Sequence, residues 1–301
     1  MTGEAGVIAS ALVRIRAGLE PVGRRLAAEG LPSPEWEGRL IRPLVGYAGF
    51  VGDPAPGDPV WSALAAVQLA HEASLVHDDV IDGSAERRGR PTVAASRGVA
   101  AAIVEGDHLL TSAYRLAAEA GSAEWCGLFA RAVERTVAGE KAQAMRAGES
   151  LEWPEYEAVV LGKSGELLGA ALAAGPVLRG EWAAHRWYEA GRRLGLVYQM
   201  LDDLLDYCPH ASTGKPALID YRRGLWTWPR PYFGLPAGLD DDAVVTRIGT
   251  PDDGGRTPLD RALERLRAEA EAVALELADL LPGDGIVPAL LAEWLDRAED
   301  A

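Results

Sequence analysis

The sequence has few cysteines and no obvious targeting segment. Only two of its 301 residues are cysteine, Cys126 and Cys208, and their spacing matches neither a metal-binding nor a disulfide framework. No charged segment followed by an apolar one opens the chain, and no apolar run reaches about 18 residues. We therefore expect a cytoplasmic protein with reduced thiols and without a transmembrane segment.

Positive charge is also scarce. The chain contains 30 Lys and Arg residues against 45 Asp and Glu residues, which gives a net charge of −15. Proteins that bind nucleic acid need a basic face against the phosphates, so this balance argues against a nucleic-acid partner. If the substrate is a small anion, the chain must place its few cations locally to bind it.

Strand-like alternation of Val, Ile and Thr is nearly absent, whereas alanine and leucine recur with helical spacing. The expected helices cover about 5–28, 32–44, 60–82, a stretch around 106–110, 122–148, 154–175, 181–206, 257–281 and 287–299. We expect 224–232 to be irregular, 240–255 to be loop-rich, and the small residues of 169–175 to allow close helix packing. With 48% hydrophobic residues and no internal repeat, the sequence predicts a single all-α domain over 1–301.

Three carboxylates, Asp78, Asp79 and Asp82, stand at the end of one predicted helix. The first and last lie about one turn apart on the same face, and a basic run at 87–90 follows. Carboxylates held this close repel one another unless a cation lies between them. Mg²⁺ usually binds through one or two carboxylates plus substrate phosphates, and arginine suits the same phosphates. Taken alone, the pattern also fits a solvated acidic helix end followed by a basic loop.

A second acidic cluster repeats the same spacing farther along the chain. Asp202, Asp203 and Asp206 again end an apolar helical segment, and Lys215 lies in the loop that follows. Two helix ends of the same design, each followed by a basic loop, are poorly explained as solvated surfaces. They predict a site in which metal ions and a diphosphate are held between the two clusters.

These motifs resemble those of the trans-isoprenyl diphosphate (polyprenyl) synthases over the stretch from Gly38 to about Pro229. The two acidic clusters look like the two aspartate-rich motifs of that family. Further matches are Arg87-Arg88-Gly89, Gly106-Asp107, Lys163-Ser164, Tyr198-Gln199, Gly214-Lys215 and Asp220. The resemblance implies a helical bundle around a deep apolar cavity, usually a homodimer. It also implies the Mg²⁺-dependent, head-to-tail joining of isopentenyl diphosphate to an allylic diphosphate.

The resemblance assigns each group of residues a role. Mg²⁺ would be bound by Asp78, Asp82 and Asp202, supported directly or through water by Asp79, Asp203 and Asp206. The allylic diphosphate would be held by Arg87, Lys163 and Lys215, and isopentenyl diphosphate by Arg39, Arg42, His71 and Arg88. Ser164 and Gln199 would line the developing cation. Catalysis would thus depend on Asp78, Asp79, Asp82, Lys163, Gln199 and Asp202. His77 is expected to pack or hydrogen-bond at its helix end.

Two positions depart from the family pattern. Arg39 stands where the family usually has lysine, which keeps a phosphate ligand but changes its geometry. Leu225 stands where the loop after the second motif commonly carries another lysine. Arg222 or Arg223 could supply the missing charge, and the sequence leaves that choice open.

The residue five positions before the first acidic motif often forms the floor of the product cavity in this family. Here it is Ala73, with Ser74 beside it and Ala70 one turn deeper. A small floor leaves room for growth, so we expect a product longer than farnesyl diphosphate, with geranylgeranyl diphosphate as the first candidate. In the alternative, Ala73 is ordinary helix packing and the floor is formed by His108, Tyr114 or Met145.

Three other functions remain open at this point. A class I terpene cyclase shares the metal–diphosphate chemistry, and Leu225 with the Trp226 and Trp228 pair leaves room for it, but it would not consume isopentenyl diphosphate. A non-catalytic subunit of a heteromeric synthase would not turn over by itself. A prenyltransferase with a non-isoprenoid acceptor would need acceptor contacts that the sequence does not reveal.

Overall fold

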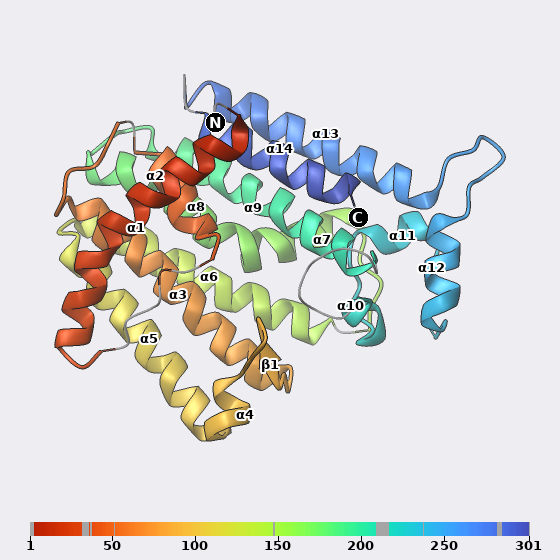
Figure 1. The fold of residues 1–301 in the computed structure, drawn as a ribbon, viewed down its shortest axis with the longest axis horizontal. Coiled ribbons are helices and arrows are strands. Elements are labelled where there is room, and N and C mark those ends of the chain that lie inside the picture. The colour runs from red at the N-terminus through yellow and green to blue at the C-terminus, as the bar shows by residue number, and fades with distance from the viewer. Residues whose placement is uncertain are drawn as a thin grey trace.

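The structure, a computed structural model, describes residues 3–31, 36, 38–50, 52–146, 148–208, 217–236, 238–281 and 285–300. It confirms the all-α prediction, and Figure 1 shows a bundle of helices with one short hairpin. The helices of the first half are α1 (Glu4–Ala28), α2 (Ile41–Ala48), α3 (Pro59–Ile81), α4 (Val93–Arg97), α5 (Val99–Glu119) and α6 (Ala123–Met145). The hairpin strands are β1 (Glu86–Arg87) and β2 (Arg90–Pro91).

The second half begins with a nearly continuous helical stretch made of α7 (Trp153–Val160), the π-helical turn η1 (Leu161–Gly165) and α8 (Glu166–Leu178). It continues with α9 (Ala184–Asp206), α10 (Ile219–Arg222), α11 (Pro229–Phe233), α12 (Asp241–Gly249), α13 (Pro258–Ala278) and α14 (Ile286–Glu299). Most of the long helices therefore lie where helical periodicity places them.

Helix α8 forms the centre of the bundle. It packs against α2, α3, α6 and α9, and every residue from Glu166 to Val177 is buried. Its small residues allow the close approach that the sequence predicts: a Cβ atom on Gly191 of α9 would lie 2.7 Å from the carbonyl oxygen of Leu168. The stretch Trp153–Leu178 has the length and composition of a membrane span, but 78% of its most apolar window is buried inside the bundle.

The remaining long helices surround this centre. Helix α5 packs along α3, α13 along α9, and α1 against α14, so the first and last helices lie side by side (Figure 1). Buried side chains from Ile8 to Ala298 form one contiguous hydrophobic core. The single domain expected over 1–301 stays a prediction.

Three of the predicted elements were wrong in their bounds. The stretch 224–232 is not irregular throughout, because α11 begins within it at Pro229. Helix α2 begins at Ile41 rather than near residue 32, because Leu40 has a positive φ of 44° that interrupts the helix; residues 32–35 lie outside the described part of the chain. The stretch 240–255 is not all loop, since α12 forms within it. Its N-cap is Asp240, whose side chain accepts a hydrogen bond from the backbone N–H of Ala243, 2.8 Å away.

Candidate active site

The first acidic cluster lies at the carboxyl end of α3, which stops at Ile81 with Asp82 as its C-cap residue. Asp79 is the buried member of this cluster. It is 5% exposed and pairs with Arg87, whose Nη2 lies 2.8 Å from Asp79 Oδ1. Asp78 and Asp82 are more open to solvent.

The basic run after this cluster folds into the β1–β2 hairpin. Arg88 and Gly89 form its two-residue turn with φ values of 53° and 73°, the positive values that a type I′ turn requires. Thr92 fastens the hairpin to the end of α3, because its hydroxyl donates a 2.8 Å hydrogen bond to the Ser84 carbonyl. The ion pair with Asp79 and this turn together fix the positions of Arg87 and Arg88.

The second acidic cluster ends α9 and repeats the division of roles. Asp203 is 4% exposed and accepts hydrogen bonds from the Tyr156 hydroxyl and the Gln199 amide, both at 2.7 Å. The Ser164 hydroxyl in turn donates to Gln199 Oε1 at 2.7 Å, which fixes the orientation of that amide. Burial, with Asp220 and Asp202 nearby, raises the pKa of Asp203.

Asp206 connects the second cluster to the segment that follows it. Its two carboxylate oxygens accept hydrogen bonds from the backbone N–H groups of Ile219 and Asp220, each at 3.0 Å. These contacts hold the start of α10 against the end of α9. Asp202, which also ends α9, is exposed. Lys215, expected to bind the allylic diphosphate, lies outside the described residues.

Lys163 lies between the two acidic clusters. Its Nζ atom is 2.8 Å from Glu140 Oε1 and 2.9 Å from Gln143 Oε1, and the charges of Glu140, Asp78 and Asp203 all raise its pKa. Lys163 lies in the π-helical turn η1, which directs its side chain toward Glu140 and Gln143. Helix α6 can approach that turn closely only because residue 139 is glycine: a Cβ atom there would lie 2.5 Å from the Lys163 nitrogen.

A second cation, Arg223, contacts the first cluster. Arg223 follows α10, and its Nη1 atom lies 2.9 Å from Asp82 Oδ1 while Nη2 donates to the Asp82 carbonyl oxygen at 3.0 Å. Because Asp206 fastens α10 to α9, this contact brings the ends of α3 and α9 to one site (Figure 1). Arg222, the other candidate for the missing charge, instead pairs with Asp241.

The oxygen-rich donor set of this site suits a hard divalent cation. Within the described part of the chain no three His, Cys, Asp or Glu side chains converge closely enough to hold a metal by themselves. Mg²⁺ does not need such a cage, because it commonly takes one or two carboxylates and completes its shell with phosphate and water. Burial and the nearby Glu140 raise the pKa of Asp78 to about 6, a sign of negative charge that a cation would relieve.

A cluster of cations lies beside the acidic site. Burial lowers the pKa of Arg42 to about 10, and its Nε atom is buried without a hydrogen-bond partner. The pKa of His71 falls well below its usual value because of burial and then the charges of Arg42, Arg88 and Arg87. Among the described residues no carboxylate pairs with Arg42 or Arg88. The structure therefore brings together three of the four side chains expected to hold isopentenyl diphosphate.

Arg39, the fourth, lies in a different environment. Its Nη2 atom is 2.7 Å from Glu293 Oε1 on α14, near the C-terminus. Arg297 on the same helix lies close enough for its charge to interact with Arg39, and burial followed by that repulsion lowers the pKa of Arg297. The last helix thus borders the site, which the motifs did not reveal.

Two further residues of the site were missed by the sequence analysis. Tyr156 binds Asp203 from 47 positions away, and Glu140 binds Lys163 from a different helix. The helical periodicity of α6 could have placed Glu140 one turn from Gln143, on the face toward the site. No local signal could have found Tyr156, since its position depends on how α7 packs against α9.

The residues considered for the cavity floor lie in contrasting places. Ala73 is 1% exposed on α3, and the Ser74 hydroxyl donates to the His71 carbonyl oxygen of its own helix at 2.8 Å. The three alternatives, His108, Tyr114 and Met145, are on the surface of the chain, and Met145 is 74% exposed. Ala73 is therefore better placed than those three to face an interior cavity.

The remaining motif residues have structural contacts. His77 packs against Gly106 and lies 3.4 Å from Asp107 Oδ1, so it fills a helix contact, as expected. Trp228 is buried and donates from Nε1 to the Met200 carbonyl at 2.9 Å. The Trp226 ring lies 4.7 Å from the guanidinium of Arg230. Both tryptophans therefore brace the chain after α10.

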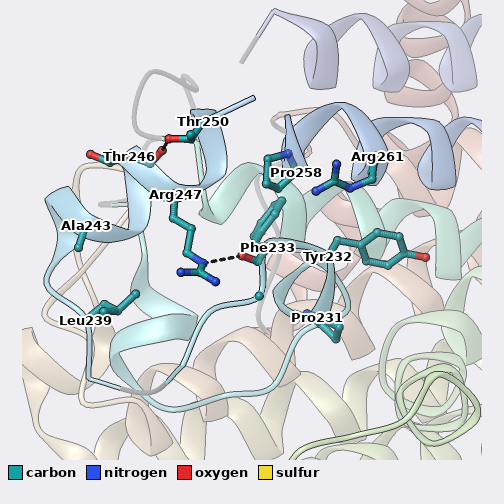
Figure 2. Close-up of a pocket in the computed structure, with 11 residues that line it drawn as sticks. Pro231, Tyr232, Phe233, Leu239, Ala243, Thr246, Arg247, Thr250, Pro258 and Arg261 are labelled. Carbon is teal, nitrogen blue, oxygen red and sulfur yellow. Dashed lines mark hydrogen bonds between the residues drawn. The ribbon is translucent and has the colours of Figure 1, made fainter. Parts of the chain in front are cut away.

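A separate hollow of about 720 Å³ lies between α11, α12 and α13 (Figure 2). Arg247 lies on its wall and donates from Nε to the Phe233 carbonyl oxygen at 3.2 Å. None of the residues expected in the active site lines it. The predicted chemistry therefore belongs to the acidic clusters and not to this hollow.

Comparison with known proteins agrees with this geometry. The family model described as polyprenyl synthetase matches residues 35–234. Octaprenyl diphosphate synthase of Escherichia coli (strain K12) is 29% identical over 235 residues, which cover 77% of this chain and 72% of that protein. Nonaprenyl diphosphate synthase of Mycobacterium tuberculosis is 32% identical over 236 residues, covering 77% and 70%.

The solved structures give the same result for the fold. A polyprenyl synthase from Caulobacter crescentus CB15, complexed with calcium and isoprenyl diphosphate, superposes with a TM-score of 0.77. It is 28% identical, and the match covers 97% of both chains. A geranylgeranyl pyrophosphate synthetase from Pyrococcus horikoshii Ot3 superposes at 0.73 with 21% identity, which indicates a shared fold.

Proposed function

The chain belongs to the polyprenyl synthetase family and is a prenyl-elongating transferase, and we propose that it joins isopentenyl diphosphate head-to-tail to an allylic diphosphate with Mg²⁺. The observation that carries this proposal is the group formed by two cations, Arg42 and Arg88, beside the His71 imidazole. In a chain with a net charge of −15, carboxylates are abundant, yet none of those described pairs with Arg42 or Arg88. Arg42, whose Nε atom is buried without a hydrogen-bond partner, and Arg88 are cations without a counter-charge among the described residues, and such cations indicate a site for an anionic ligand.

The two acidic helix ends supply the second diphosphate site. Asp78, Asp82 and Asp202, with Asp206 beside them, would hold the metal ions, which when bound neutralise charge that develops on the leaving diphosphate. Lys163, already directed between the clusters, donates to the same diphosphate, and Arg87 is held nearby by Asp79. These preorganised cations stabilise the leaving group as the bond between carbon and oxygen breaks.

The rest of the reaction needs no side-chain nucleophile. As the allylic carbon–oxygen bond breaks, the oriented Gln199 amide and Ser164 hydroxyl present their dipoles to the allylic cation. The double bond of isopentenyl diphosphate, bound by Arg42, His71 and Arg88, attacks that cation and forms the new carbon–carbon bond. A proton then leaves the adjacent carbon for the released diphosphate, which restores the double bond.

The product is proposed to be at least as long as geranylgeranyl diphosphate. Ala73 is small and only 1% exposed at the position expected for the floor, and a side chain of this size supports growth beyond farnesyl diphosphate. The names of the relatives, octaprenyl and nonaprenyl diphosphate synthase, favour chains longer than geranylgeranyl. Geranylgeranyl diphosphate is thus the shortest product that we propose, and a longer chain replaces it as the first candidate.

The decisive experiment is turnover by the purified chain with Mg²⁺, labelled isopentenyl diphosphate and farnesyl diphosphate, followed by mass spectrometry of the products. We expect consumption of isopentenyl diphosphate and a ladder of longer diphosphates. A cyclase would release diphosphate without consuming isopentenyl diphosphate, and a non-catalytic subunit would do neither. Either result would overturn the proposal.

Changing Ala73→Phe should shorten the product, because the added ring occupies space that the growing chain needs. The ring adds volume to a packed helix, so a loss of about 1–3 kcal/mol in the free energy of unfolding is expected as well. Product length is read by mass spectrometry under the same conditions. Ala73→Ser, which nearly keeps the volume, is the matched control and should leave the length unchanged. Equal products from both variants would place the floor elsewhere.

We also propose that the protein is a homodimer. Helix α5 exposes several apolar side chains although most of its length is packed against α3: Val99 is 54% exposed, Ile103 44% and Val104 67%. A second copy would remove this surface from water. Light scattering after size-exclusion chromatography should give twice the mass of the chain, and a monomeric mass would contradict the proposal.

A further inference from the structure

Arg223 pairs with Asp82 of the first acidic cluster and lies on a segment that Asp206 of the second cluster holds. We propose that Arg223 binds the allylic diphosphate and that its ion pair with Asp82 is the resting position from which it does so. This rests on the proposed function, because it takes Asp82 to be a metal ligand during turnover. The experiments below separate the two claims.

The segment that carries Arg223 is fixed to the site at several points. Asp206 accepts hydrogen bonds from the first two residues of α10. The Tyr221 hydroxyl donates to the Pro236 carbonyl at 2.7 Å and accepts from the Leu239 N–H at 2.8 Å. Because this segment is already anchored, its backbone loses little conformational freedom when Arg223 binds a ligand, and this favours affinity.

A buried cation strengthens this anchoring. The guanidinium of Arg230, a residue that is 5% exposed, lies 5.1 Å from the Tyr221 ring centroid and 4.7 Å from that of Trp226. It therefore sits between rings that flank Arg223 in the sequence, and contacts of this kind stabilise a buried arginine. By sequence, Trp226 is one reason to keep the terpene cyclase alternative open. Its contact with Arg230 gives Trp226 a structural role instead.

Electrostatics determine what Arg223 does once substrate arrives. With Asp82 paired to Arg223, the carboxylate is neutralised and the arginine has both a side-chain and a backbone acceptor. If Asp82 held a metal ion, Arg223 would lose most of that attraction and would be free to bind an anionic diphosphate at the same site. Arginine suits this ligand because its fork can bind two phosphate oxygens at once.

The residues next to Arg223 are not placed to bind the diphosphate. Arg222 is turned to Asp241 on α12, with a contact of 3.2 Å from its Nε atom to Asp241 Oδ1, and is half exposed. Leu225 has no charge to contribute. The structure thus decides between the two arginines that the sequence left open: it places Arg223 at the site and Arg222 away from it.

The test compares Arg223→Ala with Arg222→Ala, a matched loss of one charge at the adjacent position. The measurements are the KM values of both substrates and the Kd of inorganic pyrophosphate in the presence of Mg²⁺. For Arg223→Ala we expect KM for farnesyl diphosphate and Kd for pyrophosphate to rise about 10- to 100-fold, the usual range for a lost charge-assisted hydrogen bond. KM for isopentenyl diphosphate should change less than about twofold, as should all three values for Arg222→Ala.

A rescue experiment excludes a merely structural role. Arg223→Lys should recover part of the lost affinity, and Arg223→Ala combined with Leu225→Lys should do so as well, because a cation returns to the same loop. If Arg223→Ala behaves like Arg222→Ala, or weakens both substrates equally with a lowered Tm, the inference fails. If the unchanged protein neither binds pyrophosphate with Mg²⁺ nor consumes isopentenyl diphosphate, the proposed function fails instead.

Discussion

Replacing Asp78→Asn should lower kcat/KM by about 10³-fold while leaving the fold intact. The amide keeps the size of the carboxylate but removes the charge that would hold a metal ion against the leaving diphosphate. The measurement is turnover of labelled isopentenyl diphosphate with farnesyl diphosphate at saturating Mg²⁺. Asp241→Asn is the control, because Asp241 is half exposed and pairs only with Arg222 at the surface, and it should stay within about twofold of the unchanged protein.

Asp78→Asn should lower activity without lowering the stability of the metal-free protein. Burial and Glu140 raise the pKa of Asp78 to about 6, so its carboxyl group stabilises the fold while protonated and loses that contribution as the pH rises through about 6. Without metal at pH 7, Tm of Asp78→Asn should therefore equal or exceed that of the unchanged protein. With Mg²⁺ and pyrophosphate the order should reverse. Retention of more than about a tenth of kcat/KM would contradict the assignment.

The local geometry of both clusters followed from the sequence. Helical spacing predicts that the first and last aspartates of each motif share a face, and the middle aspartates, Asp79 and Asp203, are the buried members. The ends of α3 and α9 were also predicted correctly, since short-range signals mark them. Such features depend on residues within one or two turns, which the sequence displays directly.

Other parts of the site could not be predicted because they depend on tertiary packing. Arg39 forms an ion pair with Glu293, which lies more than 250 positions away in the sequence, and no pattern near either residue indicates that contact. The choice between Arg222 and Arg223 depends on how Asp206 fixes the start of α10. The start of α2 was misplaced for a related reason: Leu40 adopts a positive φ, a rare conformation for leucine that no local pattern announces.

A buried carboxylate, Glu166, forms several tertiary contacts beside the site. Glu166 follows the π-helical turn η1 and is 1% exposed. It forms a 2.8 Å ion pair with Arg192 of α9 and a hydrogen bond with the Tyr188 hydroxyl. Arg135 of α6 approaches it at 3.7 Å, so one carboxylate joins the three elements that position Lys163 and Ser164.

Replacing Glu166→Ala should therefore destabilise the protein strongly, by about 3–5 kcal/mol in the free energy of unfolding, because Arg192 and the Tyr188 hydroxyl lose their buried partner. In a chain of this size that corresponds to a fall in Tm of about 10 °C, measured by calorimetry. Glu189→Ala is the matched control: Glu189 also contacts Arg192, at 2.7 Å, but is 54% exposed, so its loss should cost less than about 1 kcal/mol. Similar Tm values for the two variants would show that the buried carboxylate does not hold α6, α8 and α9 together.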